Sequence, residues 1–482
     1  MAPNISFSDA VLPNSTLLAA GTLIVLLVVT LTRHFFLRRS RPAATPPQLP
    51  HLLQFPPSRR HTLARFSQFE KHRGPSEIHP EILKSRALTT TRDHDFQDNL
   101  YTPTGFSTQE LGALGRFPDY SVLSGVPHPE PVSSSWDVSR AIFRPFRPFR
   151  WNYHQHMALM KYDPNWWVEL TSSYVPTMAK RQTLLAQQKD RIFFQSASPG
   201  TELAVRELME MLLQFLCIRY PAHFSLSSDR TVFHNGLLNT VTDLLTTPPL
   251  KVIFGNVPED YAIMLRNEET GYYHLRSAMV CSSVGWHVAL HQDAPLRAIH
   301  TDVPDADKMA MSMDRWFAKL ATDAPVMRCS WSLEDWEAMF TSPEAERAEG
   351  REWHRSAFTN EPERLTYKDI RLRCDAQTLR RLPLSGAVVF NFKAVFTPFE
   401  ELRDEPYIPA LLLKVLEGGK ENLITYKCDA NVRRVAMEAL KVWADEQVRN
   451  GVVPADWEVT TLDESPFYPG WEERWKRKQG LS

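Results

Sequence analysis

Apolar and polar positions alternate in one segment of the C-terminal half, GAVVFNFKAVF at residues 386–396. The apolar face of this segment would consist of Val388, Phe390, Phe392, Ala394 and Phe396. Asn391 and Lys393 fall on the opposite face. This alternation predicts a half-buried strand of an antiparallel sheet, with its apolar side toward the core. Residues 272–290, YYHLRSAMVCSSVGWHVAL, predict one or two further strands.

Two other segments have helical patterns. TELAVRELMEMLLQFLCIRY, residues 201–220, follows Ser198-Pro199, a pair suited to a helix N-terminus. Its apolar residues lie nearly all round the helix, which predicts a core helix. NVRRVAMEALKVWADEQVRN, residues 431–450, predicts an amphipathic helix before a polar tail. Because helices and strands do not alternate regularly, the sequence favours the α+β class.

The N-terminal region contains an uncharged apolar run, LLAAGTLIVLLVVTL at residues 17–31. With the residues after it, about 20 residues suit one membrane span, and we expect a transmembrane anchor at 17–36. Asp9 precedes the run, and the basic residues follow it. This charge order favours a retained anchor over a cleaved signal peptide. The positive-inside rule then places the body of the protein in the cytosol.

This topology predicts a single-pass membrane protein, with the endoplasmic reticulum as the expected membrane. Residues 1–16 would form a short lumenal tail, whose sequons at Asn4 and Asn14 predict a glycoprotein. Residues 37–135 begin with a proline-rich stretch typical of a semi-rigid spacer and are expected to be linker and irregular chain. The compact domain is expected at 136–430, and a C-terminal helix and tail at 431–482.

Composition excludes several classes of function. Lys and Arg number 55 against 56 Asp and Glu, a balance that gives no support for a nucleic-acid partner. The five cysteines are far apart in sequence, which is typical of a reducing compartment without a disulfide framework. The chain has no GxSxG, HExxH, P-loop or GxGxxG motif. We therefore expect no nucleotide or flavin site in the chain itself.

Candidate chemistry lies in two segments. In RPFRPFR, residues 144–150, proline favours extended backbone, and we expect Phe side chains inward and Arg side chains outward, with contact to anionic lipid as an alternative. His154 and His156 follow and would share a face of a strand, a weak metal motif by itself. His300 ends the short apolar run APLRAI. It could be a metal or haem ligand, a general base, or a core histidine bonded to a carbonyl.

Five segments in order, across roughly residues 143–402, resemble the haem subunit family of oxidative N-demethylases, which are dimethylamine monooxygenase-like and called HRQ family proteins in fungi. The segments are FRPFRWNYHQHMALMKYDPNWWVELTSSYVPTMAKRQTLL, RNEETGYYHLRSAMVCSSVGW, APLRAIHTDVP, APVMRCSWSLEDW and AQTLRRLPLSGAVVFNFKAVFTPFEEL. The resemblance implies a PAS-like haem domain, in which an antiparallel sheet with helices encloses haem b.

The resemblance also implies roles for single residues, since a haem needs an axial ligand, an apolar slot and cations for its propionates. His300 would bind the iron, with His156 as the second choice and Cys281 as a weaker one. Arg328 would pair with a propionate, Gln377 would hydrogen-bond a ligand or propionate, and Phe390 would line the slot. The alternatives are a structural ion pair for Arg328 and a strand cap for Gln377.

The implied function is a membrane-anchored, haem-dependent oxidoreductase, an O2-dependent monooxygenase or N-dealkylase-like enzyme that acts on a small organic substrate. Because the chain shows no flavin or nucleotide signature, electrons would come from NADPH through a separate reductase. Two alternatives remain open: a PAS-like sensor that binds haem or another ligand without catalysis, and a membrane scaffold without haem.

Overall fold

The computed structural model describes residues 52–60, 63, 102–154, 157–267, 270–284, 287–300, 304, 306–341 and 365–481. Contacts divide the chain into two units, Met1–Pro50 and His51–Ser482, and every described residue belongs to the second unit. The anchor predicted at 17–36 therefore lies outside the described residues. Among the helices that are described, none has both the length and the apolar character needed to cross a membrane.

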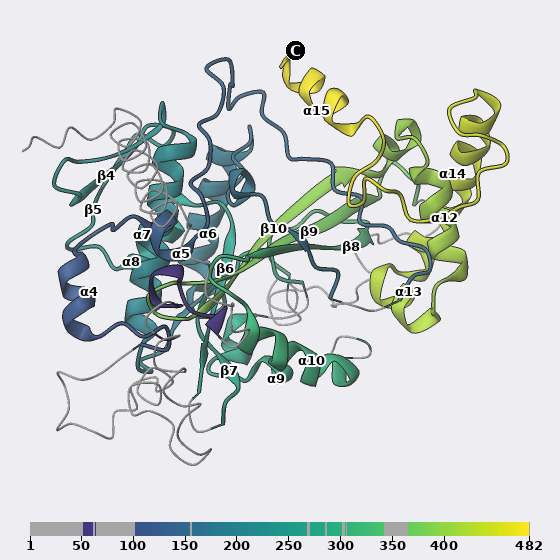
Figure 1. Cartoon of the computed structure of the whole chain (residues 1–482). Coiled ribbons are helices and arrows are strands. Elements are labelled where there is room, and N and C mark those ends of the chain that lie inside the picture. Colours follow the sequence, from purple (N-terminus) through teal and green to yellow (C-terminus); the bar gives the residue numbers. More distant parts are fainter. Residues whose placement is uncertain are drawn as a thin grey trace, which may run out of the picture. The chain divides into compact units, whose positions relative to one another are not determined.

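A seven-stranded antiparallel sheet forms the centre of the second unit, in the order β1-β8-β9-β10-β6-β7-β2 (Figure 1). Its strands are β1 Met160–Lys161, β2 Phe193–Gln195, β6 Asp260–Arg266, β7 Tyr273–Met279, β8 Val326–Glu334, β9 Arg371–Arg381 and β10 Val388–Pro398. The sheet and its surrounding helices confirm the α+β class and the antiparallel sheet. The strand predicted at 386–396 is β10, and residues 272–290 contribute one strand, β7.

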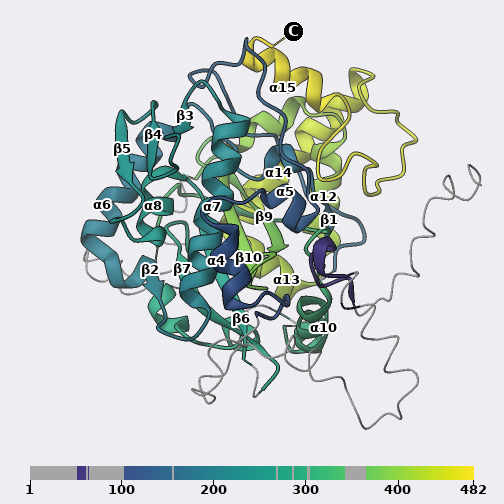
Figure 2. The ribbon, with the colours of Figure 1, turned by 60° about the vertical axis from the view of Figure 1, so that its left-hand side comes forward.

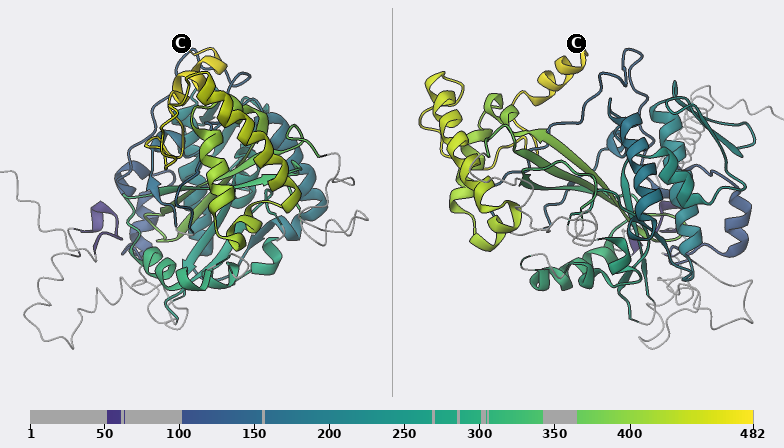
Figure 3. Two further views of the ribbon diagram at one scale, coloured as in Figure 1. Left: turned by 90° about the vertical axis from the view of Figure 1, so that its right-hand side faces the viewer. Right: turned by 180° about the vertical axis from the view of Figure 1, so that it is seen from behind.

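One face of this sheet is covered by helices at both ends (Figure 3). The first group is α6 Tyr174–Ile192, α7 Thr201–Arg219 and α8 Pro249–Asn256, which pack on β6 and β7. The second group is α12 Ile408–Gly418, α13 Glu421–Lys427 and α14 Ala430–Arg449, which pack on β8 and β9. As predicted, α7 is a core helix and α14 is the amphipathic C-terminal helix. The N-cap of α7 is Gly200, not Ser198.

The opposite face is covered over a smaller area. There α9 Leu296–Ile299, α10 Ala306–Lys319 and the 3-10 turn η4 Val288–His291 pack over β6, β7 and the start of β10. Phe317 of α10 lies 5.4 Å from Phe390 between ring centroids. Beyond Phe390, the helical cover formed by the described residues ends, and the following residues of β10 that share its face are only half-buried.

Smaller elements complete the described unit. A second sheet, β3 Phe224–Leu226, β4 Val232–Asn235 and β5 Thr240–Asp243, lies beside α7 and α8 (Figure 2). Three more elements are η3 Pro164–Trp166, η6 Phe399–Asp404 and α15 Trp471–Gln479. Residues 37–135 were expected to be linker and irregular chain, but they contain α4 Thr108–Leu114 and α5 Tyr120–Ser124. Tyr120 and Leu123 are buried in the first core, the apolar cluster beneath α6, α7 and α8, which explains why these two short helices form in a polar segment.

From Asn391 onward, the burial of β10 is the reverse of the predicted one. Its side chains alternate as expected, but Asn391 is 0% exposed and Lys393 is 4% exposed, whereas Phe392 and Phe396 are half-buried. The Arg side chains of RPFRPFR also differ from the prediction, because Arg144 and Arg147 are buried in ion pairs with Glu169 and Glu405. In both places, acidic partners from distant segments make burial of the cation favourable.

Candidate functional site

Three of the residues selected from the sequence lie close together on the half-open face of the sheet. Arg328 of β8 is paired in register with Gln377 of β9, and Gln377 is paired with Phe392 of β10. Residues paired in this way point to the same side of a sheet. Phe390 lies two positions before Phe392 on the same face, and its ring stacks on Phe392 at 5.9 Å and 10°. We name this surface the open face.

His300 is placed at the edge of the open face by α9, of which it is the C-cap. Its Nδ1 lies 2.9 Å from the carbonyl oxygen of Leu296. Because a carbonyl only accepts, Nδ1 carries the hydrogen, and Nε2 keeps a free lone pair. Among the described residues, Nε2 has no hydrogen-bond partner. This arrangement fixes the tautomer and the ring orientation that a metal ligand requires.

Electrostatics favours the neutral form of His300. Burial lowers the pKa of its imidazole, and the positive charge of Arg328 lowers it further, while the hydrogen bond to Leu296 acts in the opposite direction. Neutral imidazole is the form that binds a metal. Arg328, 28 residues away in sequence, is thus one of the charges that act on this imidazole.

Arg328 is half-buried, and its Nε is shielded from solvent without an acceptor among the described residues. Burial lowers the pKa of this guanidinium, and the nearby carboxylate of Asp375 opposes the shift. Asp375 is already held by Arg373, with 2.8 Å between guanidinium nitrogen and carboxylate oxygen. The described part of the chain therefore gives Arg328 no ion pair. The predicted alternative, a structural ion pair, is not found among those residues.

Gln377 and Phe390 complete the set selected from the sequence. Gln377 lies inside β9, so it does not cap a strand, and its amide has no hydrogen-bond partner among the residues described. Phe390 is 8% exposed and packs between Phe317 and Phe392. The open face thus combines an apolar aromatic surface with an imidazole, a guanidinium and an amide that each have unused hydrogen-bonding or ligating capacity.

Of the two alternative iron ligands, only Cys281 lies among the described residues. His156 lies outside the described residues. In His154, the other histidine of the weak metal motif, Nδ1 lies 3.2 Å from the carbonyl oxygen of Asn152. Cys281 is fully buried in the first core, and burial raises the pKa of its thiol to about 12. A thiol with this pKa stays protonated near neutral pH and is a poor ligand. Of the three, His300 is the one whose described geometry fits iron.

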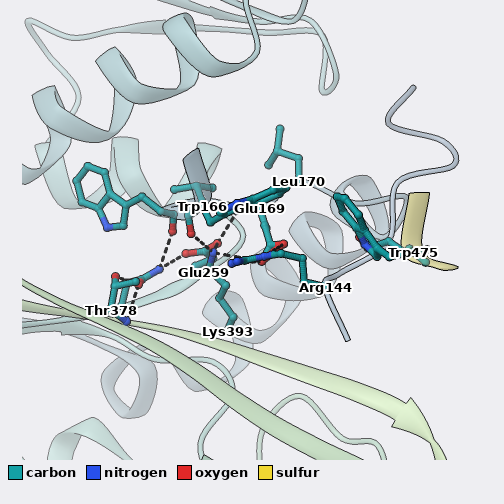
Figure 4. Close-up of polar contacts among 12 residues, drawn as sticks. Arg144, Trp166, Glu169, Leu170, Glu259, Thr378, Lys393 and Trp475 are labelled. Carbon is teal, nitrogen blue, oxygen red and sulfur yellow. Dashed lines mark hydrogen bonds and ion pairs between the residues drawn. The ribbon is translucent and has the colours of Figure 1, made fainter. Parts of the chain in front are cut away.

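On the opposite side of β10, the structure contains a cluster of buried charges that sequence reasoning did not find (Figure 4). Lys393 Nζ lies 3.1 Å from Glu259 and 3.8 Å from Glu169, and it donates to the carbonyl oxygen of Trp166 at 2.9 Å. Arg144 pairs with Glu169 at 3.1 Å. We name these residues, with Glu259 and Asn391, the buried polar cluster. No local motif marks it, because its members come from four distant segments.

The buried polar cluster borders a cavity of about 660 Å³ at the edge of β10, where β6 stops pairing. Phe392 also lines this cavity, so the cavity reaches round the strand edge to the open face. Burial raises the pKa of Glu259 to about 7, while Lys393 opposes that shift. For Glu169, the charges of Arg144 and Lys393 outweigh burial and hold its pKa below the usual range.

The open face fits a haem group. A haem requires an axial ligand, an apolar surface and a cation for its carboxylates. His300 offers a lone pair on Nε2, Phe390 and Phe392 offer flat apolar surface, and Arg328 offers a guanidinium without a carboxylate partner among the described residues. These features come from three separate elements, α9, β8 and β10, and the sheet register aligns Arg328 with Phe392 through Gln377 of β9.

The comparison with protein families agrees with this geometry. The sequence model of one family, described as haem-dependent oxidative N-demethylase, alpha subunit-like, matches residues 158–437, which is more than half of the chain. The matched range contains His300, Arg328, Gln377 and Phe390. The resemblance found in the sequence is confirmed, and the chain belongs to the haem-dependent oxidative N-demethylase, alpha subunit-like family.

Proposed function

We propose that this protein is a haem-dependent monooxygenase that removes an alkyl group from nitrogen in a small organic substrate. The observation that carries the proposal is the open face, where an apolar strand surface stays half-exposed beside a histidine whose Nε2 has no partner among the described residues. Haem, when bound, supplies a redox-active iron that couples the reduction of O2 to oxidation of the substrate. The membership of the family supports the haem-dependent oxidative chemistry.

In this proposal, each residue of the open face has a separate task. His300 holds the iron through Nε2, and the Leu296 carbonyl keeps its ring in the ligating orientation. Arg328 holds a carboxylate of the haem, and Phe390 packs against the macrocycle. Gln377 presents an amide that can donate to or accept from a bound substrate. Together they would bind and orient the reactants and exclude water from them.

Electrons must come from outside this chain. Conversion of an N-methyl amine, O2, two electrons and two protons into the demethylated amine, formaldehyde and water requires a donor of two electrons per turnover. The sequence carries no flavin or dinucleotide motif. We therefore propose a separate reductase that takes electrons from NADPH. The apolar run at 17–31 supports a single-pass anchor in the endoplasmic reticulum membrane, with the catalytic domain in the cytosol.

The first experiment is haem reconstitution of the full chain in detergent, followed by absorbance spectroscopy. We expect a Soret band at one haem per chain and no flavin absorbance. If no Soret band develops, the scaffold alternative without haem replaces this proposal. If haem binds, formaldehyde is measured with methylated amines, NADPH and an added reductase. Stable haem binding without product across reductases and amines would favour the sensor alternative.

The proposed topology is tested separately. Carbonate extraction of membranes should leave the protein in the pellet, and deletion of residues 1–40 should release it. A C-terminal tag should be digested by protease added to sealed microsomes. Protection of the tag would reverse the orientation, and carbonate release of the full chain would remove the anchor from the proposal. Neither result bears on haem binding.

A further inference from the structure

One buried carboxyl group, that of Glu259, takes no part in the haem site of the open face. Glu259 lies between α8 and β6, and its carboxyl group contacts β10 (Figure 4). Its Oε1 lies 3.1 Å from Lys393 Nζ and accepts from the backbone N–H of Glu169 at 3.0 Å, while its Oε2 accepts from Asn391 Nδ2. Only 4% of the residue is exposed. Groups from two other segments thus hold this carboxyl in one position.

The charges around Glu259 allow it to gain and lose a proton. Among the described residues, Lys393 is the only cation within 4 Å of its carboxyl group, and the same ammonium also faces Glu169 at 3.8 Å. Glu169 has Arg144 as a second partner at 3.1 Å. Burial above all, and also repulsion from Glu169, favour the protonated form of Glu259, whereas Lys393 favours the ionised form. The pKa of Glu259 therefore lies at about 7, while that of Glu169 stays below its usual range.

The other titratable groups that face Glu259 do not change their charge near neutral pH. Burial raises the pKa of three phenols, which stay neutral: those of Tyr162, Tyr220 and Tyr261. Arg181 of α6 donates to the backbone oxygen of Glu259 at 3.2 Å, and its charge is paired with Asp260. Glu259 is thus the group of this region whose protonation changes near pH 7.

The cavity of about 660 Å³ connects this carboxyl group with the open face. Glu259 and Lys393 line the cavity, and so do Phe392 and Phe396, which lie on the other face of β10. The cavity can reach both faces because β6 pairs with β10 only as far as Phe392. From Lys393 onward, this edge of β10 has no neighbouring strand among the described residues. A path from Glu259 to the open face therefore runs round the edge of the strand.

The same cavity suits water and opens to solvent. Its lining includes several hydroxyl groups, those of Thr171, Ser172, Ser173, Thr177, Ser282 and Thr397. A polar space of this size can hold many waters, since one water needs roughly 10–15 Å³. Lys180 and Lys478 also line it and are exposed, so protons from solvent can enter.

The proposed reaction consumes two protons for each O2 that is reduced, and a haem that covers the open face would separate that surface from solvent. We propose that Glu259 is a proton donor that takes up protons from water in the cavity and passes them, through water at the edge of β10, to oxygen as O2 is reduced. In each turnover two protons come from solvent, one oxygen atom leaves as water, and Glu259 returns to its protonated form. Lys393 stabilises the carboxylate that remains after each proton leaves. The proposal rests on the proposed function.

The test compares Glu259→Gln with Glu207→Gln in the full chain with haem, a reductase and a methylated amine. Both residues are buried carboxyl groups with a pKa of about 7, but Glu207 lies on α7, outside the described lining of the cavity. In the unmodified protein, kcat for formaldehyde should fall as the pH rises through about 7, because the donor must be protonated. Glu259→Gln should remove this limb and lower kcat at pH 6 at least about 10-fold, with KM within about 2-fold. Glu207→Gln should keep the limb, kcat and KM.

Infrared difference spectra between pH 5 and 9 follow the proton without haem or turnover. A carboxyl C=O band with a midpoint near pH 7 should be lost in Glu259→Gln, and the separate band lost in Glu207→Gln distinguishes the two groups. In Glu169→Gln, loss of the neighbouring negative charge should move the midpoint of Glu259 and the kcat limb to lower pH. This variant provides the same test if Glu259→Gln does not fold.

The outcomes separate failure of the relay from failure of the proposed function. Product formation with an unchanged kcat limb in Glu259→Gln, or with the limb at the same pH in Glu169→Gln, would overturn the relay alone. A lower kcat in Glu259→Gln without a change in the pH profile or the infrared band would assign Glu259 a structural role and refute the relay. A missing Soret band in the unmodified protein, or haem binding without product, would overturn the proposed function and the relay together.

Discussion

The two faces of β10 have opposite relations between polarity and burial. On one face, Asn391 and Lys393 are almost fully buried within the polar cluster. On the other, Phe392 and Phe396 remain half-buried although they are apolar. A stable sheet normally buries its apolar side and exposes its polar side. The polar face is completed by partners within the chain, whereas the open face stays partly exposed among the described residues, where we propose that a bound group covers it.

The helices explain how both faces can be stable. Two helical groups cover the polar face, and the charges that they enclose are paired with one another, which offsets their desolvation. On the open face, cover from α10 ends at Phe390. Among the described residues, this apolar surface lacks cover beside groups that could bind a ligand, an arrangement characteristic of a binding site. Substitutions on the polar face should therefore change the stability of the protein, and substitutions on the open face should change the binding of haem.

The largest effect is expected from Lys393→Met on the polar face. The substitution leaves Glu259 and Glu169 buried without their shared cation, and breaking a buried ion pair costs about 3–5 kcal/mol. Urea unfolding of the haem-free protein measures this cost. Replacement of Arg403, whose pair with Glu446 is exposed, should cost much less than this. Equal costs for the two variants would remove the contrast between the buried cluster and surface pairs.

On the open face, His300→Ala should weaken haem binding by about 100-fold or more, or about 3 kcal/mol, because loss of even an outer partner of a metal ligand costs 10–100-fold. Stability of the haem-free protein should change little. His274→Ala is a matched control, since His274 Nδ1 also lies 2.9 Å from a backbone carbonyl, that of Asp293. An unchanged Soret band in His300→Ala, with its loss in His156→Ala, would transfer the ligand role to His156.

The helix-covered face should also show a pH dependence at Glu207 of α7. Burial raises the pKa of this carboxyl to about 7, although it accepts backbone hydrogen bonds from Leu384 at 2.5 Å and Ser385 at 2.8 Å. The folded pKa lies above the unfolded value of about 4.5. Its contribution to stability is therefore complete below about pH 4.5 and is lost as the pH rises through about 7, by at most about 3 kcal/mol.

Glu207→Gln should remove this part of the pH dependence. Unfolding free energies of both proteins are measured between pH 5 and 8, and the curve of the variant should be flatter. Glu421→Gln is the control, because Arg433 lowers the pKa of the exposed Glu421 carboxyl and no loss is expected in this interval. Parallel curves for Glu207→Gln and the unmodified protein would contradict the assignment to Glu207.

The smallest effect distinguishes two stacked rings of the open face. Phe390→Ala removes a buried ring and should cost about 3 kcal/mol in the haem-free protein, whereas Phe392→Ala should cost about 1–2 kcal/mol less because Phe392 is half-exposed. Haem should narrow this difference in unfolding free energy. Bound haem would cover Phe392, so Phe392→Ala would then also lose the contact of the ring with haem. Thermal unfolding with and without haem measures both variants. A difference unaffected by haem would argue that Phe392 does not contact it.

Sequence patterns predicted the helices and strands more reliably than the burial and contacts of their side chains. The alternation in 386–396 identified β10 and the residues on each of its faces, and the periodicity in 201–220 identified α7. The patterns did not predict α4 and α5, because a capping box at Ser107 and a few buried residues define these short helices within a polar segment. They also did not predict burial of Arg144 and Arg147, whose acidic partners lie 25 and 258 residues away in sequence.

The sequence by itself determined the periodicity of the main elements, the family resemblance and the identity of His300, Arg328 and Gln377 as candidates, because each depends on residues close together in the chain. Tertiary structure alone decided which face of β10 is buried, which cations have carboxylate partners among the described residues, and where β8 and β10 lose their neighbouring strands. Burial and ion pairing depend on segments brought together from distant parts of the chain, and no local pattern specifies those contacts.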